Sequence, residues 1–290
     1  MDDEDWLAQR FEQHRGHLRA VAYRMLGSLP EADEAVQDAW LRLSRAGGEG
    51  VENLGGWLTT VVARVCLNVL QSRKAHPEQP AGLRMPDPVV SREGQADPEQ
   101  EAILADSVGL ALLVVLEALE PDERLAFVLH DMFDLPFEEI GPMVGRTATA
   151  ARQLASRARR RIQGASVAPA ERDLARQREV VDAFFAAGRA GDFDALVRVL
   201  HPDVVLRSDV PKIGQQRGVA RVARLALGGG KTGGSVVHVL VNGAAGALIV
   251  EGGQLVTVMA FTVSDGRIVA IEGIMDRDRL RRIDLGALTS

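Results

Sequence analysis

The stretch 137–163, FEEIGPMVGRTATAARQLASRARRRIQ, decides the fold of the middle of this chain. A supporting helix is expected up to Val144, and the turn at Gly145-Arg146-Thr147 lets a second helix begin directly behind it. Six arginines and no acidic residue lie between Arg146 and Gln163. This pattern predicts a helix-turn-helix whose second helix enters a DNA groove.

The outward face of this second helix supplies the predicted DNA contacts, because arginines face phosphates and side chains near the helix start reach base edges. The residues predicted to face inward are Ala151, Leu154, Ala155, Ala158 and Ile162. The predicted DNA-binding set is Arg146, Thr147, Thr149, Arg152, Gln153, Ser156, Arg157 and Arg160, with 159–161 nearer the phosphates. An acidic protein partner or RNA is the alternative ligand of such a helix.

The charge of the chain is segregated along its sequence. The 290 residues include 34 basic and 40 acidic side chains, for a net charge of −6, so the arginine cluster is a local feature. Between Asp106 and Glu139 there are nine acidic residues and one basic residue, Arg124. With 46% hydrophobic residues, the chain is long enough for two or three domains, each with its own core.

The single cysteine, Cys66, cannot form an internal disulfide, and its valine-rich surroundings predict a buried thiol rather than a nucleophile. The sequence 1–5, MDDED, has neither the charge nor the apolar run of a signal peptide. No apolar run of about 18 residues is present to span a membrane. We therefore expect a cytoplasmic protein without a membrane partner, and the absence of a Cys/His cluster predicts neither a metal nor a cofactor.

Three blocks are separated by polar linkers. Helical spacing of apolar residues marks a first block at 5–75 and a second at 105–165, whereas 76–104 contains five prolines and predicts an extended linker, with disorder as the alternative. In the third block, 174–290, helices precede alternating strands, and Asp265-Gly266 indicates a hairpin. The predicted fold class is multidomain: two all-α blocks followed by an α+β domain with a curved antiparallel sheet.

Particular segments of the first two blocks carry a resemblance to a known family. Residues 31–43, EADEAVQDAWLRL, resemble the region 2 helix with which extracytoplasmic-function sigma factors, group IV of the sigma-70 family, grip the polymerase clamp. Residues 57–74 resemble the next helix, which opens and recognises the −10 element, and 119–161 resemble region 4, which recognises the −35 element. The resemblance implies a non-enzymatic promoter-specificity subunit whose partners are RNA polymerase core (the β′ clamp and β flap) and promoter DNA.

The resemblance assigns roles to two sets of polar residues in the first block. The set expected to bind polymerase is Asp33, Glu34, Gln37, Asp38, Leu41 and Arg42. Leu41 lies off the apolar stripe among charges, which is typical of an interface anchor, and a merely solvated face is the alternative. The set expected to bind −10 DNA is Arg64, Asn68, Gln71, Ser72, Arg73 and Lys74. The alternative is that Arg73 and Lys74, at the C-terminal end of this helix, only stabilise it by complementing its dipole.

The third block resembles the SnoaL-like (NTF2-like) fold, a cone of curved sheet closed by helices that a subset of these sigma factors carries. In that subset the linker holds a Trp-Leu-Pro-Glu-Pro motif, where this chain has 84–88, RMPDP. An Asp-Gly-Gly-Gly motif is replaced by Asp209 and 210–212, VPK, and an Asn-Pro-Asp-Lys-Leu motif by 276–280, DRDRL. The interdomain or regulatory candidates are Pro86, Asp87, Pro88, Asp209, Asp276 and Asp278.

The cone is expected to enclose a pocket. The polar candidates near its strands are His201, Asp203, Arg207, Asp209, His238 and Glu251, and the predicted pocket set is His201, Arg207 and His238. Relatives of this fold include cyclases and isomerases, and His and Asp groups perform acid–base chemistry when their geometry suits. We expect instead that the domain regulates the sigma blocks by contact, with a small-molecule ligand as a further partner. Two rivals remain: a ligand-sensing one-component DNA-binding regulator, and a SnoaL-type cyclase or isomerase with a DNA-binding appendage.

Overall fold

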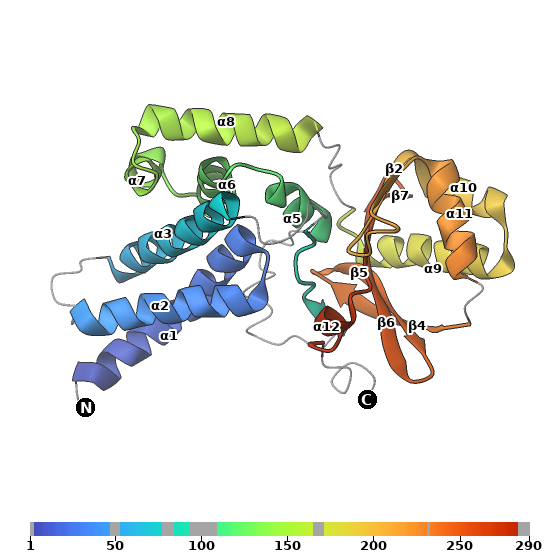
Figure 1. The fold of residues 1–290 in the computed structure, drawn as a ribbon, viewed down its shortest axis with the longest axis horizontal. Coiled ribbons are helices and arrows are strands. Elements are labelled where there is room, and N and C mark those ends of the chain that lie inside the picture. The colour runs from blue at the N-terminus through green and yellow to red at the C-terminus, as the bar shows by residue number, and fades with distance from the viewer. Residues whose placement is uncertain are drawn as a thin grey trace. The chain divides into compact units, whose positions relative to one another are not determined.

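The computed structural model describes residues 3–46, 53–76, 84–92, 109–164, 171–230 and 233–283, and these form two compact units (Figure 1). Unit 1 contains the described residues up to 76 and those of 115–164. Unit 2 contains 84–92, 109–114 and the described residues from 171 onward. Each unit is organised around its own helices, and only unit 2 contains strands among the residues that are described.

Unit 1 begins with three helices, α1 (Asp3–Leu26), α2 (Leu29–Ala46) and α3 (Leu54–Ala75). They pack together because each presents an apolar stripe, which includes Leu18 of α1, Val36 of α2 and Leu58 of α3, all fully buried. The side chain of Asn53 accepts a hydrogen bond of 3.0 Å from the Gly56 amide and so fixes the start of α3. The helical prediction for this block is confirmed by these three elements.

The helix α3 is long and apolar enough to span a membrane by length and composition. Among its side chains, Leu58, Val62 and Cys66 have no exposed surface. Burial raises the pKa of the Cys66 thiol to about 12, as expected of a core cysteine that is not a nucleophile. We therefore take α3 as the core helix of a three-helix group.

The second half of unit 1 is the predicted helix-turn-helix. It contains α6 (Pro121–Phe127), a π-helical turn η1 (Val128–Met132), α7 (Phe137–Met143) and α8 (Ala148–Gly164), and α5 (Leu110–Glu117) precedes them across the boundary between the units. The turn between α7 and α8 needs glycine twice. Gly145 has a φ of +64°, and a Cβ on Gly141 would lie 2.8 Å from the carbonyl oxygen of Arg146.

Unit 2 is an α+β domain with a seven-stranded sheet in the order β1-β4-β5-β6-β7-β2-β3. Its strands are β1 (Val90–Ser91), β2 (Leu200–Ser208), β3 (Gln215–Arg217), β4 (Ser235–Val241), β5 (Ala244–Glu251), β6 (Gln254–Ser264) and β7 (Arg267–Ile274). Its helices are α9 (Leu174–Ala190), α10 (Phe193–Val199), α11 (Val219–Gly229) and α12 (Arg277–Leu280). The helices α9, α10 and α11 cover the same side of the sheet (Figure 1) and bury an apolar core against it that includes Val181, Leu196 and Phe261.

The predicted cone is confirmed, and the sheet is antiparallel except where β2 pairs with β7 in parallel. Asp265 and Gly266 both have positive φ, as the predicted hairpin between β6 and β7 requires. Four elements of unit 2 were not predicted: β1, β3, α11 and α12. Gly228 and Gly229 lie in the last turn of α11, and within the described part of the linker Val90 and Ser91 form a strand that pairs with β4.

Candidate nucleic-acid and polymerase interfaces

Five exposed polar side chains form one continuous face of α8. Thr149, Arg152, Gln153, Ser156 and Arg160 recur at helical spacing and are all solvent-exposed, whereas Ala151, Leu154, Ala155 and Ala158 on the opposite side are buried. The Arg160 guanidinium lies 3.5 Å from the Ser156 carbonyl, and Arg152 lies over the Phe137 ring. Among the described residues neither arginine forms an ion pair, so both cations remain available for phosphates or base edges.

The flanks of α8 differ from this face because their arginines are held by acidic residues of the preceding helices. Glu123 is buried and lies 3.1 Å from both Arg157 and Arg161. Arg159 forms a two-bond ion pair with Asp131, at 2.6 and 3.1 Å. These pairs anchor α8 to α6 and η1, so Arg157, a predicted DNA contact, also has a structural partner.

The two predicted DNA contacts at the turn are exposed but have local partners as well. Arg146 lies 3.7 Å from Asp122, and the Thr147 hydroxyl accepts a hydrogen bond of 3.2 Å from the Ala150 amide, which caps the first turn of α8. Both side chains therefore help to orient the recognition helix.

The predicted polymerase-binding residues lie on the outward face of α2. Leu41 is 42% exposed, one of the few large apolar side chains at the surface, while Ala32, Val36 and Leu43 of the same helix are buried. Asp38 and Arg42 pair at 2.8 Å beside it, and Asp33 forms a two-bond ion pair with Arg19 of α1 at 2.5 and 3.1 Å. An exposed apolar side chain surrounded by charges is the arrangement of an interface anchor.

The six predicted −10 residues do not share one environment. Arg64, Asn68, Gln71 and Ser72 are exposed along α3. Arg73 instead is half-buried, forms an ion pair with Glu31 and lies 3.4 Å from the carbonyl of Leu26, so it joins α3 to α2 and α1. This contact places Arg73 in the packing of the three-helix group.

The last turns of α3 contact the helix α6 of the second half of unit 1. The Lys74 ammonium pairs with Glu120, and the Gln71 amide donates to Asp122 at 3.3 Å. Deeper in the same interface, Arg124 donates to the carbonyl of Arg24. The cationic end of α3 is therefore covered by acidic side chains of the chain itself. The sequence interpretation missed these acidic partners, whose only signal was the high acidic content between Asp106 and Glu139.

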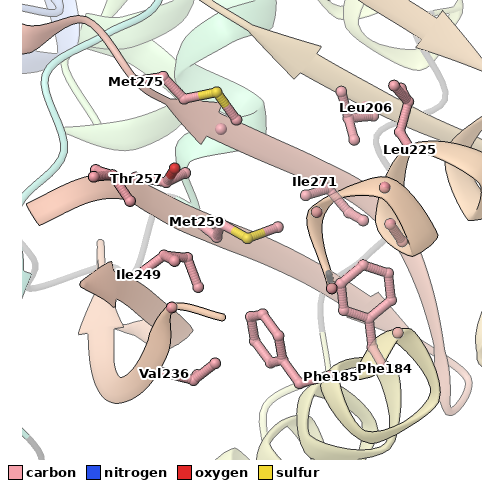
Figure 2. A pocket seen from close by; sticks show the side chains of 18 of the residues that line it. Phe184, Phe185, Leu206, Leu225, Val236, Ile249, Thr257, Met259, Ile271 and Met275 are labelled. Atoms are coloured by element: carbon pink, nitrogen blue, oxygen red, sulfur yellow. The ribbon is translucent and has the colours of Figure 1, made fainter. Parts of the chain in front are cut away.

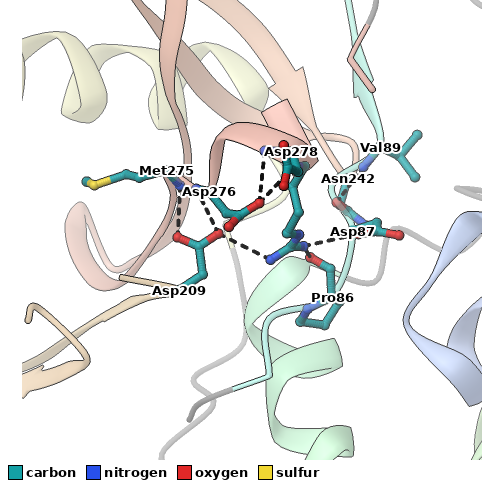
Figure 3. Close-up of polar contacts among 9 residues, drawn as sticks. Pro86, Asp87, Val89, Asp209, Asn242, Met275, Asp276 and Asp278 are labelled. Atoms are coloured by element: carbon teal, nitrogen blue, oxygen red, sulfur yellow. Dashed lines mark hydrogen bonds and ion pairs between the residues drawn. The ribbon is translucent and has the colours of Figure 1, made fainter. Parts of the chain in front are cut away.

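Five of the six regulatory candidates lie at or beside one cluster in unit 2 (Figure 3). Its centre is Arg279, which donates to the Pro86 carbonyl at 2.6 Å and lies 3.2 Å from Asp87 and 3.3 Å from Asp209. Asp209 also accepts from the amides of Met275 and Asp276, and Asp276 caps α12 through the amides of Asp278 and Arg279. The sixth candidate, Pro88, is buried and directly follows Asp87 in the chain.

The segment 84–92 is bound to the sheet by its main chain as well. The amide of Val89 donates to the Asn242 side chain at 3.2 Å, the Asn242 amide donates to the Val89 carbonyl at 2.8 Å, and β1 pairs with β4. Arg279 and Asn242 therefore hold this segment, and neither was among the predicted site residues. Asn242 offered one signal, since it lies in an Asn-Gly turn between two apolar runs.

Unit 2 contains a cavity of about 570 Å³ between the sheet and helices α9 and α11 (Figure 2), but the three predicted pocket residues do not line it. Arg207 alternates with the cavity-lining Leu206 and Ser208, so it points to the other face of the sheet, where it pairs with Glu272 at 2.8 Å. His201, near the start of β2, accepts a hydrogen bond from the Asp203 amide, and His238 contacts Arg178 and Asp182. These three residues therefore do not belong to this cavity, whereas Glu251, another of the polar candidates, lines it.

These features define a class of protein, in which a helix-turn-helix is joined to a three-helix group whose helix α2 exposes Leu41 among charged side chains. Residues 10–76 match the family Sigma-70 region 2, and residues 109–162 match Sigma-70, region 4. Both matches fall on the helices that carry the predicted polymerase and promoter contacts.

Relatives identify the subgroup. The ECF RNA polymerase sigma factor SigJ of Mycobacterium tuberculosis is 37% identical over 93% of this chain and 91% of its own length. The probable ECF RNA polymerase sigma factor SigI of the same species is 37% identical over 73% of each chain. The crystal structure of M. tuberculosis SigJ superposes with a TM-score of 0.76 at 36% identity, over 94% of this chain and 97% of that one.

The chain belongs to the extracytoplasmic-function RNA polymerase sigma factors, with a C-terminal SnoaL-like domain. It is a transcription initiation factor rather than an enzyme, and its partners are RNA polymerase core and promoter DNA. These matches do not favour the rival interpretations as a one-component regulator or a cyclase.

Proposed function

We propose that this sigma factor recognises the −35 element with the exposed face of α8, binds the β′ clamp with the outward face of α2, and opens the −10 element with the exposed end of α3. Region 4 is also proposed to contact the β flap. The observation that supports the proposal is that the arginines of α8 fall into two sets, one paired with acidic residues and one exposed without an ion pair among the described residues. The flanking arginines of α8 are held by Glu123 and Asp131, whereas Arg152 and Arg160 on its central face form no ion pair among the described residues. The face of α8 that carries Arg152 and Arg160 is therefore available to bind DNA.

Promoter opening requires the contact between α3 and α6 to break. Lys74 and Gln71, two proposed −10 contacts, are engaged by Glu120 and Asp122 of region 4. A phosphate and a carboxylate cannot occupy the same place beside the Lys74 ammonium. The arrangement of unit 1 therefore corresponds to a closed state, and polymerase binding would have to separate regions 2 and 4.

The SnoaL-like domain is proposed to modulate initiation through the segment that connects those regions. Residues 84–92 follow region 2 and precede region 4 in the chain, and they are bound to unit 2 by Arg279, Asn242 and the β1–β4 pairing. Their capture attaches part of the linker between the two regions to unit 2. We place this activity in the cytoplasm, with functional blocks at 5–75, 105–165 and 174–290.

Run-off transcription with core polymerase tests this modulation. We compare the wild-type chain with Arg279→Ala, and use Arg281→Ala as the matched control because Arg281 pairs only locally with Asp278 among the described residues. Release of the segment is expected to change promoter-dependent RNA by at least about threefold, which corresponds to about 0.6 kcal/mol, while the control stays near wild type. Equal RNA from all three chains at every concentration, together with faster amide hydrogen exchange at 84–92 in Arg279→Ala, would exclude the modulation.

A further inference from the structure

The cavity of unit 2 is not explained by promoter recognition or by packing. Protein interiors are filled to the density of organic crystals, with few voids larger than a water molecule. A hollow of about 570 Å³ lies well above that limit and within the range of small-molecule sites. It therefore has the dimensions of a binding site for a drug-sized molecule.

The wall of the cavity is mainly apolar. Side chains from the helix α9 and from strands of the sheet converge on it (Figure 2), namely Phe184, Phe185, Val236, Ile249, Met259 and Ile271. The two phenylalanines hold each other and Phe261 in edge-on contacts with ring centres 5.5 to 5.7 Å apart. This aromatic cluster gives the cavity a rigid floor, whereas the methionine side chain adapts to the shape of a ligand.

Glycines keep the space open near the entrance. A Cβ on Gly230 would lie 2.3 Å from the carbonyl oxygen of Gly188, so the end of α11 approaches α9 closely only because Gly230 lacks a side chain. A Cβ on Gly234 would lie 2.8 Å from the side chain of Ile249. By contrast, Gly228 and Gly229 line the cavity with nothing within 4 Å of a built Cβ, so their positions face open space.

The polar side chains that line the cavity are few. The half-buried carboxylate of Glu251 and the buried hydroxyl of Thr257 line it, and the exposed Arg189 and Arg224 contribute to its rim. No histidine or cysteine is among the described lining residues. A ligand with a buried charge would lose its hydration against an apolar wall, whereas a neutral ligand with one donor group would satisfy Glu251.

We propose that this cavity binds a neutral, mainly apolar small molecule with a hydroxyl or amide donor directed toward Glu251 and Thr257. The binding is measured without polymerase, so its test is independent of the test of the regulatory role proposed for the domain. The neutral fluorophore Nile red serves as the probe for the apolar floor, which is the part of the site common to ligands of this class.

The test is a fluorescence titration of the full-length chain with Nile red. One saturable site per chain is expected. The cavity-filling variants Ile249→Trp and Val236→Phe should each weaken binding at least tenfold while retaining the far-ultraviolet circular dichroism of the wild type. The control Phe193→Ala removes a large apolar side chain that is 38% exposed and does not line the cavity, and it should bind within twofold of wild type.

A second measurement needs no variant. Saturation of the wild-type chain with Nile red should slow amide hydrogen exchange in β4, β6 and the end of α11, which surround the cavity. Absence of a saturable site would overturn the proposal, as would undiminished binding by folded cavity-filling variants, or exchange protection confined to unit 1. Tighter binding of the anionic dye 1-anilinonaphthalene-8-sulfonate than of Nile red would overturn the assignment to neutral ligands.

Discussion

Arg124 of region 4 donates two hydrogen bonds to the main-chain carbonyl of Arg24 in region 2, from Nε at 3.3 Å and from Nη2 at 3.2 Å. The Arg124 side chain is only 2% exposed, and it also donates to Glu117 at 2.9 Å. A buried cation therefore contributes to the contact between the two sigma regions in unit 1. We therefore expect one substitution, at Arg124, to weaken the contact between regions 2 and 4.

Replacement of Arg124 by alanine is expected to lower the free energy of unfolding of unit 1 by about 3 kcal/mol, because Glu117 and the Arg24 carbonyl lose a buried partner. Trp6, Trp40 and Trp57 all lie in unit 1, so urea unfolding followed by tryptophan fluorescence reports on this unit. Arg160→Ala, at an exposed position of α8, should stay within about 0.5 kcal/mol. Equal stability of the two variants would contradict the structural role of Arg124.

Glu120→Gln should favour promoter opening, because it removes the carboxylate that pairs with Lys74. The hydrogen bond from Lys74 also lowers the pKa of Glu120, so this carboxylate is ionised and paired in the closed state. An exposed pair of this kind contributes about 0.5 kcal/mol, so run-off RNA at limiting sigma factor should rise about twofold. The exposed Glu138→Gln should leave the yield unchanged, and a fall in RNA with Glu120→Gln would argue against closure.

Arg152 and Arg157 of α8 should differ in their effects, because only Arg157 forms an ion pair among the described residues. Arg152→Ala should reduce the salt dependence of promoter binding by the holoenzyme by a log–log slope of about 0.9, because one phosphate contact is lost. Arg157→Ala should change that slope less and lower the stability of unit 1, because Arg157 pairs with the buried Glu123. Filter binding at several salt concentrations measures both slopes. A larger slope change for Arg157 than for Arg152 would reverse the assignment.

Arg279→Ala should release the segment 84–92 from unit 2. The substitution removes the donor to Pro86 and the ion pairs with Asp87 and Asp209. Amide hydrogen exchange followed by mass spectrometry should show faster exchange at 84–92, with the amide of Val89 affected through its contact with Asn242. Arg281→Ala supplies the control. Unchanged exchange in both variants would mean that main-chain pairing alone holds the segment.

The pair Arg207–Glu272 predicts a pH dependence of the stability of unit 2. Burial raises the pKa of Glu272 from its ordinary 4.5 to about 7, against the opposing effect of Arg207. The folded state then binds a proton that the unfolded chain releases between these values, so stability falls as the pH rises from 4.5 to 7. The decrease is on the order of 3 kcal/mol at most.

Glu272→Gln should remove this part of the pH dependence. Unit 2 contains no tryptophan, so urea unfolding is followed by far-ultraviolet circular dichroism at pH 5 and pH 8. The loss of stability between the two pH values should be smaller in Glu272→Gln than in the wild type and in the exposed control Glu138→Gln. An identical loss in all three chains would show that Glu272 titrates as an ordinary carboxyl group.

Local patterns in the sequence were sufficient to predict the helices of unit 1 and most strands of unit 2. The alternation of buried and exposed residues in α8 follows directly from its 3.6-residue period. The Asp265-Gly266 turn was equally local, because its positive φ values require those residue types. Such features depend on neighbours along the chain.

The features that were not predicted depend on residues far apart in sequence. The strand β1 has two residues and pairs with β4 about 150 positions later, so no local alternation marks it. The pocket candidates were chosen for their polar or charged side chains, and of these Glu251 lines the cavity, whereas most of the cavity wall consists of apolar side chains such as Ile249 and Met259. The contact of Lys74 with Glu120 joins two separate helices, and charge segregation alone did not indicate which acid meets which base.

The central claim is that the exposed face of α8 recognises the promoter. The most direct test is run-off transcription by core polymerase reconstituted with the wild-type chain, with Arg152→Ala/Arg160→Ala, or with Glu138→Gln. We predict promoter-dependent RNA with the wild type and Glu138→Gln, and at least a tenfold decrease with the double variant, with each chain still bound to core. Undiminished RNA from the double variant, or no RNA from the wild-type holoenzyme at any promoter, would contradict the claim.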